Sequence, residues 1–258
     1  MASGGRCVHN YADGVPHAIR PDELVAMVRD QIAAAADPEK APAMQAYMKS
    51  TMPYRGVTSQ PLTRLCREVY ADWVLPDEES WREAVLALWD DAEFREERYA
   101  ATTLAGHRLY REHRQPCTMG LWRHLVVTGA WWDHVDDVAT HRVRELLERF
   151  PDTVTPTLRD WAVDDDLWLR RTAIICQVGL RERIDRELLT HAIDANLDGS
   201  TRTSPPESPY GREFFVRKAI GWALRDYFRT DPDWVRAFVT EREGRLSGLS
   251  RREALKHA

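Results

Sequence analysis

The residues best suited to chemistry in this 258-residue chain are a tryptophan and an aspartate four positions apart, Trp132 and Asp136. On a helix, side chains four apart share one face, and Trp131, Val135 and Val138 fall at the spacing of a neighbouring core stripe. A tryptophan displayed beside a carboxylate is not what a solvated face needs, so the pair is a candidate site. The alternative is a core tryptophan beside an ordinary surface acid.

An arginine in an apolar stripe provides the second candidate. Leu167, Ile174 and Val178 mark the buried face of a helical segment, and Arg171 lies within that stripe rather than opposite it. Such an arginine must extend to solvent or meet an acid, because a buried charge without a partner costs several kcal/mol. Asp136 is a plausible partner. An ordinary salt bridge between two helices is the alternative interpretation.

A third cluster combines an aromatic ring with two cations. Lys218, Trp222 and Arg225 follow the i, i+4, i+7 spacing of one helix face. Basic residues interleaved with exposed aromatics suit a phosphate backbone with sugars or bases packed on the rings. Gly221 in mid-helix costs about 1 kcal/mol relative to alanine, which predicts close approach of another backbone there. A basic outer face on a core helix is the alternative.

Near the N-terminus, a helix is expected to end and the chain to turn at Pro53 and Gly56. This turn leaves Tyr47, Lys49 and Arg55 near one edge. By themselves these three residues are weak evidence for a binding surface.

The elements that must position these residues all read as helices. No segment shows sustained alternation of β-branched residues, so the sequence predicts an all-α fold. Aspartates at positions 37, 77, 152 and 231 are expected to cap helices. A polar loop is expected over 198–211. The predicted helices cover residues 22–36, 39–51, 61–73, 79–90, 93–112, 118–129, 132–149, 154–163, 166–180, 183–196, 212–228 and 232–241.

About twelve such helices joined by short polar turns predict helical pairs stacked at a period near 40 residues. An irregular helical-pair solenoid of the HEAT type is therefore our first choice, and a compact helical bundle our second. Solenoids of this kind form a continuous concave surface that suits a long polymer ligand.

Composition excludes several classes of protein. The chain is 43% hydrophobic and contains ten Trp, eight Tyr and six Phe, too many for a disordered protein. No apolar run approaches 18 residues, and the first residues lack the apolar stretch of a secretory signal, so we expect a cytoplasmic protein associated with the nucleoid. A net charge of −5 argues against coating nucleic acid by bulk charge but not against a local basic face.

Metal and redox chemistry are not expected. The four cysteines are widely spread and form no CxxC pair, which favours free thiols. His134 and His141 lie seven apart, and no HExxH motif or His/Cys cluster occurs, so we expect neither a zinc site nor any other cofactor.

Taken together, these segments resemble the DNA alkylation repair family, the HEAT-like-repeat DNA glycosylases that release alkylated purines. The resemblance covers roughly residues 22–258 and leaves 1–21 as an N-terminal tail. The Trp131-Trp132-Asp133 and Lys218-Ala219-Ile220-Gly221-Trp222 blocks are its most specific parts. The other matching segments are Tyr47-Met48-Lys49 with Gly56, Leu88-Trp89-Asp90, Arg95–Ala101, Trp168–Ile174, Glu213–Phe215 and Leu249–Ala254.

The resemblance implies a C-shaped solenoid whose concave face holds duplex DNA, and hydrolysis of the N-glycosidic bond of cationic N3- or N7-alkylpurines. Carried over by position, Asp136 is the catalytic carboxylate, Trp132 and Trp222 are the paired tryptophans, and Arg171 is the site arginine. The same family precedent implies a monomer. The DNA-binding residues expected on this basis and from the clusters above are Tyr47, Lys49, Arg55, Arg170, Lys218 and Arg225.

Two other functions compete with this interpretation. A non-catalytic DNA-binding or scaffold solenoid would use Asp136, Trp132 and Trp222 for packing, with Arg171 in a structural ion pair. Burial discriminates between the two, because exposed tryptophans favour the enzyme and buried ones the scaffold. A peptide-binding HEAT protein is disfavoured, because the two cations beside Trp222 suit phosphate better than peptide.

Overall fold

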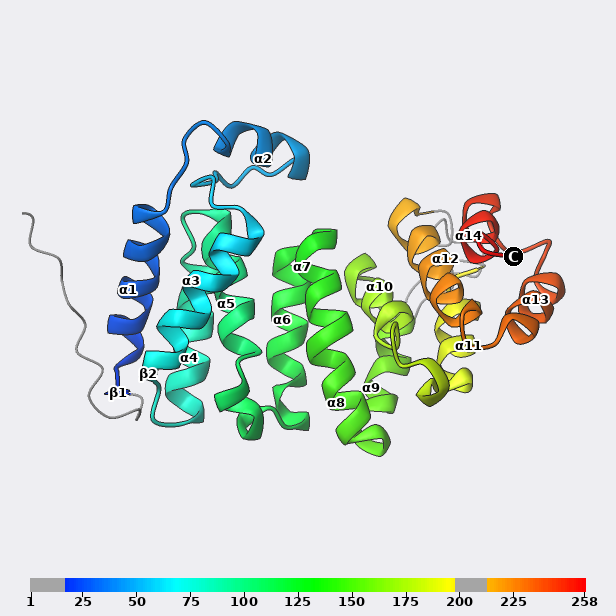
Figure 1. The fold of residues 1–258 in the computed structure, drawn as a ribbon. Helices are drawn as coiled ribbons and strands as arrows, with labels where there is room; N and C mark the ends of the chain where they lie inside the picture. The colour runs from blue at the N-terminus through cyan, green and yellow to red at the C-terminus, as the bar shows by residue number, and fades with distance from the viewer. Residues whose placement is uncertain (1–16, 198–212) are drawn as a thin grey trace, which may run out of the picture. The chain divides into compact units, whose positions relative to one another are not determined.

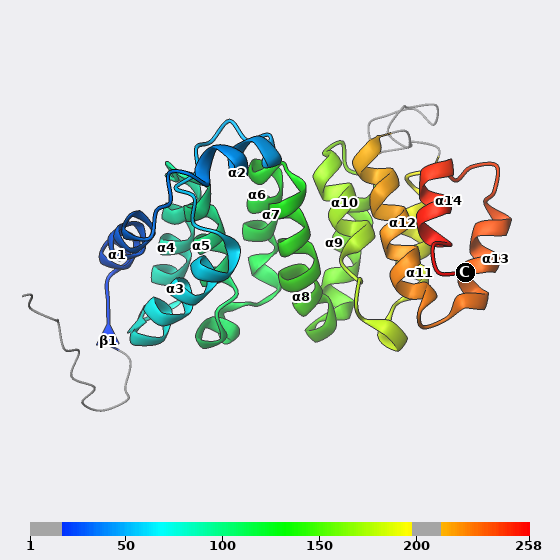
Figure 2. The ribbon, with the colours of Figure 1, turned by 45° about the horizontal axis from the view of Figure 1, so that its top comes forward.

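Residues 17–197 and 213–258 are described by a computed structural model, and within them fourteen α-helices follow one another with almost no strand (Figures 1 and 2). The predicted all-α fold is confirmed, and it is a helical repeat fold. The predicted loop over 198–211 lies outside the described residues. No helix in the described part of the chain combines the length and apolarity that crossing a membrane would need.

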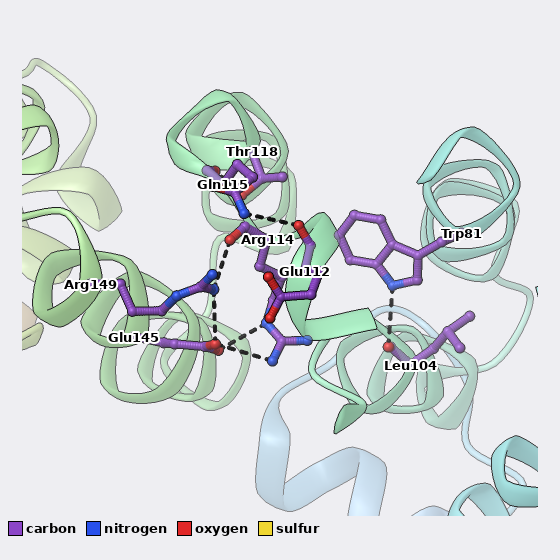
Figure 3. Close-up of polar contacts among 8 residues, drawn as sticks. All are labelled: Trp81, Leu104, Glu112, Arg114, Gln115, Thr118, Glu145 and Arg149. Atoms are coloured by element: carbon purple, nitrogen blue, oxygen red, sulfur yellow. Dashed lines mark hydrogen bonds and ion pairs between the residues drawn. The ribbon is translucent and has the colours of Figure 1, made fainter. Parts of the chain in front are cut away.

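The chain divides into two compact units, residues 1–111 and 112–258. In unit 1, α1 packs against α3 and α4, and α5 packs against both α3 and α4. Its core is centred on the fully buried Trp81 and Trp89. The indole of Trp81 also donates a hydrogen bond to the carbonyl of Leu104 at 3.4 Å (Figure 3). The helices of unit 1 are α1 Pro21–Ala34, α2 Ala41–Met48, α3 Ser59–Asp72, α4 Glu78–Asp90 and α5 Arg95–Ala105.

Residues 17–21, which the sequence analysis assigned to an N-terminal tail, are described by the structure, and they take part in the fold of unit 1. The strand β1, His17–Ala18, pairs in parallel with β2, Trp73–Val74, and the next residue, Ile19, is buried. Residues 17–21 are therefore part of the fold of unit 1, because burial of Ile19 and the strand pairing hold them in place.

In unit 2, α10 packs against α6, α7, α9 and α12, so it lies at the centre of the unit. Short 3-10 helices cover Arg108–His113, Pro116–Thr118 and Arg181–Arg183. The α-helices are α6 Met119–Gly129, α7 Trp132–Asp137, α8 Arg144–Arg149, α9 Pro151–Ala162, α10 Leu167–Ile175, α11 Arg186–Asp194, α12 Phe214–Phe228, α13 Pro232–Glu241 and α14 Gly248–Ala254.

One continuous helix runs from α7 to α8, as predicted over 132–149, but its middle is a π-helix, Val138–Val143 (Figure 2). The α8 end of this helix is bound to Arg114, which precedes α6 in unit 2. The guanidinium of Arg114 donates to the carboxylate of Glu145 at 2.8 and 3.2 Å, and Arg149 donates to the backbone carbonyl of Arg114 at 2.9 Å (Figure 3). These bonds fix α8 and, through the continuous helix, α7.

The caps were partly predicted. Asp77 accepts from the Ser80 amide at 2.8 Å and Asp231 from the Trp234 amide at 3.0 Å, as expected. The predicted cap at Asp152 is wrong, because α9 begins earlier, at Pro151, which suits the first position of a helix. Asp37 accepts from amides of a turn before α2, which starts at residue 41 rather than 39.

Candidate active site

The carboxylate of Asp136 and the guanidinium of Arg171 meet in a two-pronged ion pair. Nε of Arg171 donates to Oδ1 of Asp136 at 2.7 Å, and Nη2 donates to Oδ2 at 2.8 Å. This geometry fixes the carboxylate in orientation as well as in charge, because the planar fork of arginine matches the two oxygens. The predicted pairing of these two residues is confirmed.

Arg171 owes its position to α10. Asp166 starts this helix by accepting from the amides of Trp168 and Leu169 at 2.8 and 3.0 Å, and every residue from 168 to 175 is buried. The side chain of Arg171 is only 6% exposed. Its third nitrogen, Nη1, donates to the carbonyl of Phe215 on α12 at 2.7 Å. Arg171 thus joins α7, α10 and α12 and satisfies its charge without contact with solvent.

Asp136 is enclosed less completely. Its side chain is 18% exposed, against 6% for Arg171, so it is not fully sealed inside the fold. Burial raises the pKa of Asp136 above the usual value for an aspartate, the bonds from Arg171 oppose that shift, and the nearby charge of Asp133 adds to it. The site therefore holds a carboxylate that is partly desolvated and oriented by an arginine, on a side chain that is not completely enclosed.

The backbone around Asp136 departs from the regular helix. The π-helix begins two residues later, and the hydroxyl of Thr140 donates to the carbonyl of Asp136 at 2.7 Å. Wide turns of this kind inside α-helices are frequent at functional sites, since they re-aim the side chains of one turn. No pattern in the sequence predicted this irregularity.

Trp132 begins α7, one turn before Asp136, and its ring is half-buried. Val135 and Val138 are fully buried, so the predicted core stripe is confirmed at these positions. Trp131 differs from the prediction because it lies before the first turn and is only half-buried. It packs instead in an aromatic cluster, with ring centroids 6.1 Å from Trp168 and 5.4 Å from Phe215.

Trp222 lies on α12, two turns after Phe215, and is half-buried like Trp132. Within residues 17–197 and 213–258, neither indole makes a hydrogen bond or a ring contact. No hydrogen bond or ring contact among these residues joins either indole to Asp136. Two half-buried tryptophans without such partners fit a binding surface better than a place in the core.

The cations beside Trp222 are not free in this structure. Lys218 donates to Glu253 of α14 at 3.2 Å, and Arg225 binds the other carboxylate oxygen of the same residue. The close approach predicted at Gly221 is confirmed, because an added methyl group there would lie 2.5 Å from Cβ of Glu253 and 3.2 Å from the Ser250 carbonyl. The sequence analysis gave Leu249–Ala254 only as a matching segment and predicted neither the helix α14 nor the contacts of Glu253.

Arg170 is a correction to the sequence analysis. This side chain is completely buried, and its guanidinium donates to Glu213 at 2.8 Å and to the carbonyl of Asp164 at 3.4 Å. A fully buried guanidinium held by an acid cannot contact a DNA phosphate. Arg170 therefore serves the packing of α10, not binding.

In unit 1, Tyr47 is 76% exposed at the end of α2, a helix in which no residue is buried. Lys49 follows in a left-handed conformation and is exposed. The guanidinium of Arg55 lies 3.7 Å from the centre of the Phe94 ring. The three residues border one loop, as predicted, with Tyr47 and Lys49 open to solvent.

A buried carboxylate holds that loop. Glu96 accepts hydrogen bonds from the amides of Arg55, Gly56 and Val57 at 2.8 to 3.1 Å. Gly56 has φ +87°, and a side chain there would collide with the carbonyl of Asp37, so the turn requires glycine. Sequence reasoning had not assigned Glu96 a role, although its place in the run Glu96-Glu97 before an apolar stretch was visible.

Comparison with known proteins agrees with this arrangement. The family model described as DNA alkylation repair enzyme matches residues 28–258. A solved structure described as a predicted DNA alkylation repair enzyme from Enterococcus faecalis superposes with a TM-score of 0.69 and 29% sequence identity, over 85% of this chain and 94% of that one. No curated protein sequence matches the chain.

Proposed function

Because the chain belongs to the DNA alkylation repair enzyme family, with a role in alkylation repair and DNA as its partner, we propose that it is a DNA glycosylase. Its substrates would be N3- and N7-alkylated purines in duplex DNA, and hydrolysis of the N-glycosidic bond would be the first step of base excision repair. The observation that carries the proposal is a partly exposed carboxylate, Asp136, oriented by Arg171 one turn from the half-buried Trp132.

The chemistry requires only one carboxylate. An N3- or N7-alkylpurine is already a cation, so the C1′–N bond breaks with its electron pair passing to the base, which leaves neutral and needs no acid. The sugar becomes cationic, and the fixed negative charge of Asp136 stabilises that developing charge. Water then bonds to C1′ through its oxygen and loses a proton to the surrounding solvent. In this proposal Asp136 also orients the attacking water. Ordinary glycosidases need a second carboxylate as acid, which this substrate makes unnecessary.

Arg171 acts as a positioning residue in this mechanism. All three of its donor nitrogens are engaged with Asp136 and Phe215, so holding the carboxylate in place is favoured over binding a phosphate. The rings of Trp132 and Trp222 would receive the deoxyribose and backbone of the damaged strand. Attraction between an aromatic face and the cationic sugar adds about 0.5–2 kcal/mol.

Contacts to the DNA backbone would come from exposed cations and aromatic rings of both units. In unit 1 these are Tyr47 and Lys49, with Arg55 beside them. In unit 2 they are Lys218 and Arg225. Phosphate contacts of this kind provide affinity without sequence preference, which suits a search for rare damaged bases.

The test is release of 7-methylguanine and 3-methyladenine from methylated duplex DNA, followed by chromatography of the freed bases. Asp136→Asn keeps the size of the side chain and removes its charge, so we expect a rate at least about 100-fold lower with DNA binding largely retained. Asp137→Asn is the matched control, because Asp137 lies on the same helix and pairs with His141 at 3.2 Å instead.

A second candidate function is DNA binding without bond cleavage. It is favoured by the engagement of both oxygens of Asp136 with Arg171, which a purely structural ion pair would also show. Wild-type protein that binds methylated DNA but frees no base would support this alternative. Undiminished release by Asp136→Asn would remove Asp136 from the mechanism.

A further inference from the structure

A single carboxylate lies between the two cations of α12. Oε1 of Glu253 accepts from Nζ of Lys218 at 3.2 Å, and Oε2 accepts from Arg225. Lys218 and Arg225 lower the pKa of Glu253, and Lys256, one turn further along the C-terminal segment, contributes to the same shift. Two cations therefore share one anion, and the cluster of Lys218, Arg225 and Glu253 carries a net positive charge.

Close packing brings Glu253 to this place. Helix α14 lies beside α12 in both views (Figures 1 and 2), and Gly221 lets the two backbones approach. The hydroxyl of Ser250 donates to the carbonyl of Arg217 at 2.9 Å and fixes the register of the two helices. Because Glu253 is the only acidic residue after Glu243, its position opposite the two cations is set by the fold rather than by an excess of local acids.

The cluster is partly exposed, so a phosphate group, which is larger than the carboxylate of Glu253, can approach it. The side chains of Lys218, Arg225 and Glu253 are 39%, 26% and 21% exposed. Carboxylates and phosphates compete for the same lysine and arginine donors, and both form charge-assisted hydrogen bonds. Trp222, which lies between the two cations on the same helix face, provides the ring against which a sugar next to that phosphate would pack.

We propose that Glu253 is a resident counter-ion of a DNA phosphate site on α12 and α14, and that a phosphate must displace it from Lys218 and Arg225. The inference rests on the proposed function insofar as it places DNA on α12. It assigns to Glu253 a limiting effect on affinity. In the free protein Glu253 keeps the cations ordered, and in the complex its charge weakens binding.

This assignment has a measurable consequence for the salt dependence of binding. Each phosphate neutralised by a protein cation contributes about −0.9 to the slope of log K against log salt concentration. Because Glu253 already neutralises Lys218 and Arg225 in part, the binding of these two cations to phosphate releases fewer counter-ions from the DNA. Removing the charge of Glu253 should therefore tighten binding and steepen the slope by about one unit.

The experiment measures the affinity for an undamaged duplex between 50 and 200 mM salt, by fluorescence anisotropy. Glu253→Gln preserves the stem that packs on Gly221 and removes the charge. We expect Glu253→Gln to bind more tightly than wild type at 50 mM salt, with an advantage that shrinks about threefold by 200 mM. Glu253→Met, of similar length, repeats the test if Glu253→Gln proves unstable in a thermal melt.

Two controls isolate the cluster. Asp233→Asn makes the same change in net charge on α13, where Asp233 is exposed and pairs with Arg236 at 3.0 Å, and we expect a smaller gain and an unchanged slope. In a Lys218→Gln/Arg225→Gln background, the slope should be flatter than in wild type. Adding Glu253→Gln to that background should then tighten binding no more than Asp233→Asn does and leave the slope unchanged, because the two cations that Glu253 neutralises are gone.

The outcomes separate this inference from the proposed function. Binding by Glu253→Gln that equals wild type, equals Asp233→Asn or is weaker than wild type overturns the role of Glu253, whatever the result for base release. Wild-type protein that shows no salt-dependent binding to duplex DNA overturns both proposals. Normal base release together with unchanged binding by Glu253→Gln overturns this inference alone.

Discussion

The guanidinium of Arg171 holds both oxygens of Asp136, at 2.7 and 2.8 Å, across 35 residues of sequence. The pair is nearly buried on the arginine side and less completely enclosed on the aspartate side, with exposed fractions of 6% and 18%. A pair buried on both sides would serve only packing, and a pair exposed on both sides would be weak. The asymmetry leaves a charged and oriented carboxylate available to a ligand.

The acid limb of the pH–rate profile should report Asp136. The anion is the active form, so the rate falls as pH drops through the pKa of Asp136, and burial places that pKa above the usual value for an aspartate. The charge of Asp133 raises this pKa further. Asp133→Asn should therefore move the acid limb of base release to lower pH. A limb that stays in place would show that another group controls it.

Replacing Arg171 by methionine should have the opposite effect on the same limb. The bonds from Arg171 lower the pKa of Asp136, so their loss raises it and moves the acid limb to higher pH. Breaking a buried pair from one side costs about 3 kcal/mol in the free energy of unfolding. Urea denaturation measures that loss. Destabilisation without any movement of the limb would reduce Arg171 to a structural role.

Arg170 and Arg171 are neighbours with different roles, and this difference is testable. Arg170→Met should lower the free energy of unfolding, because Glu213 and the carbonyl of Asp164 lose a fully buried partner. It should leave the salt slope of DNA binding unchanged in the protein that remains folded. A flatter slope would contradict its assignment to the interior.

Alanine is expected to have opposite effects at two helical glycines, one in the contact between α12 and α14 and the other on α6. Gly221→Ala should destabilise by about 1–3 kcal/mol, because its methyl group would lie 2.5 Å from Cβ of Glu253. At Gly120, on α6, an added methyl group meets nothing within 4 Å, so Gly120→Ala should stabilise by up to about 1 kcal/mol. The urea midpoints of both variants measure these changes in stability. A Gly221→Ala variant as stable as wild type would contradict the close packing of α12 and α14.

Several elements followed from local patterns alone. The helices over 21–34, 78–90, 119–129 and 232–241 lie within a few residues of the predicted ranges, because apolar spacing and capping residues act within a turn or two. The prediction of free thiols also agrees with the structure for the three cysteines in the described residues, Cys66, Cys117 and Cys176. The α14 helix was missed, because seven residues with one buried alanine and one buried serine carry little periodic signal.

What the sequence by itself determined was which side chains share a face: Trp132 with Asp136, and Trp222 with its two cations. These relations depend on the helical repeat, which a few neighbouring residues specify. The tertiary structure alone decided that Glu253 engages those cations and that Arg170 is buried against Glu213 while its neighbour Arg171 holds Asp136. Such choices depend on how distant helices approach one another, and that is set by packing across the whole unit rather than by any local pattern.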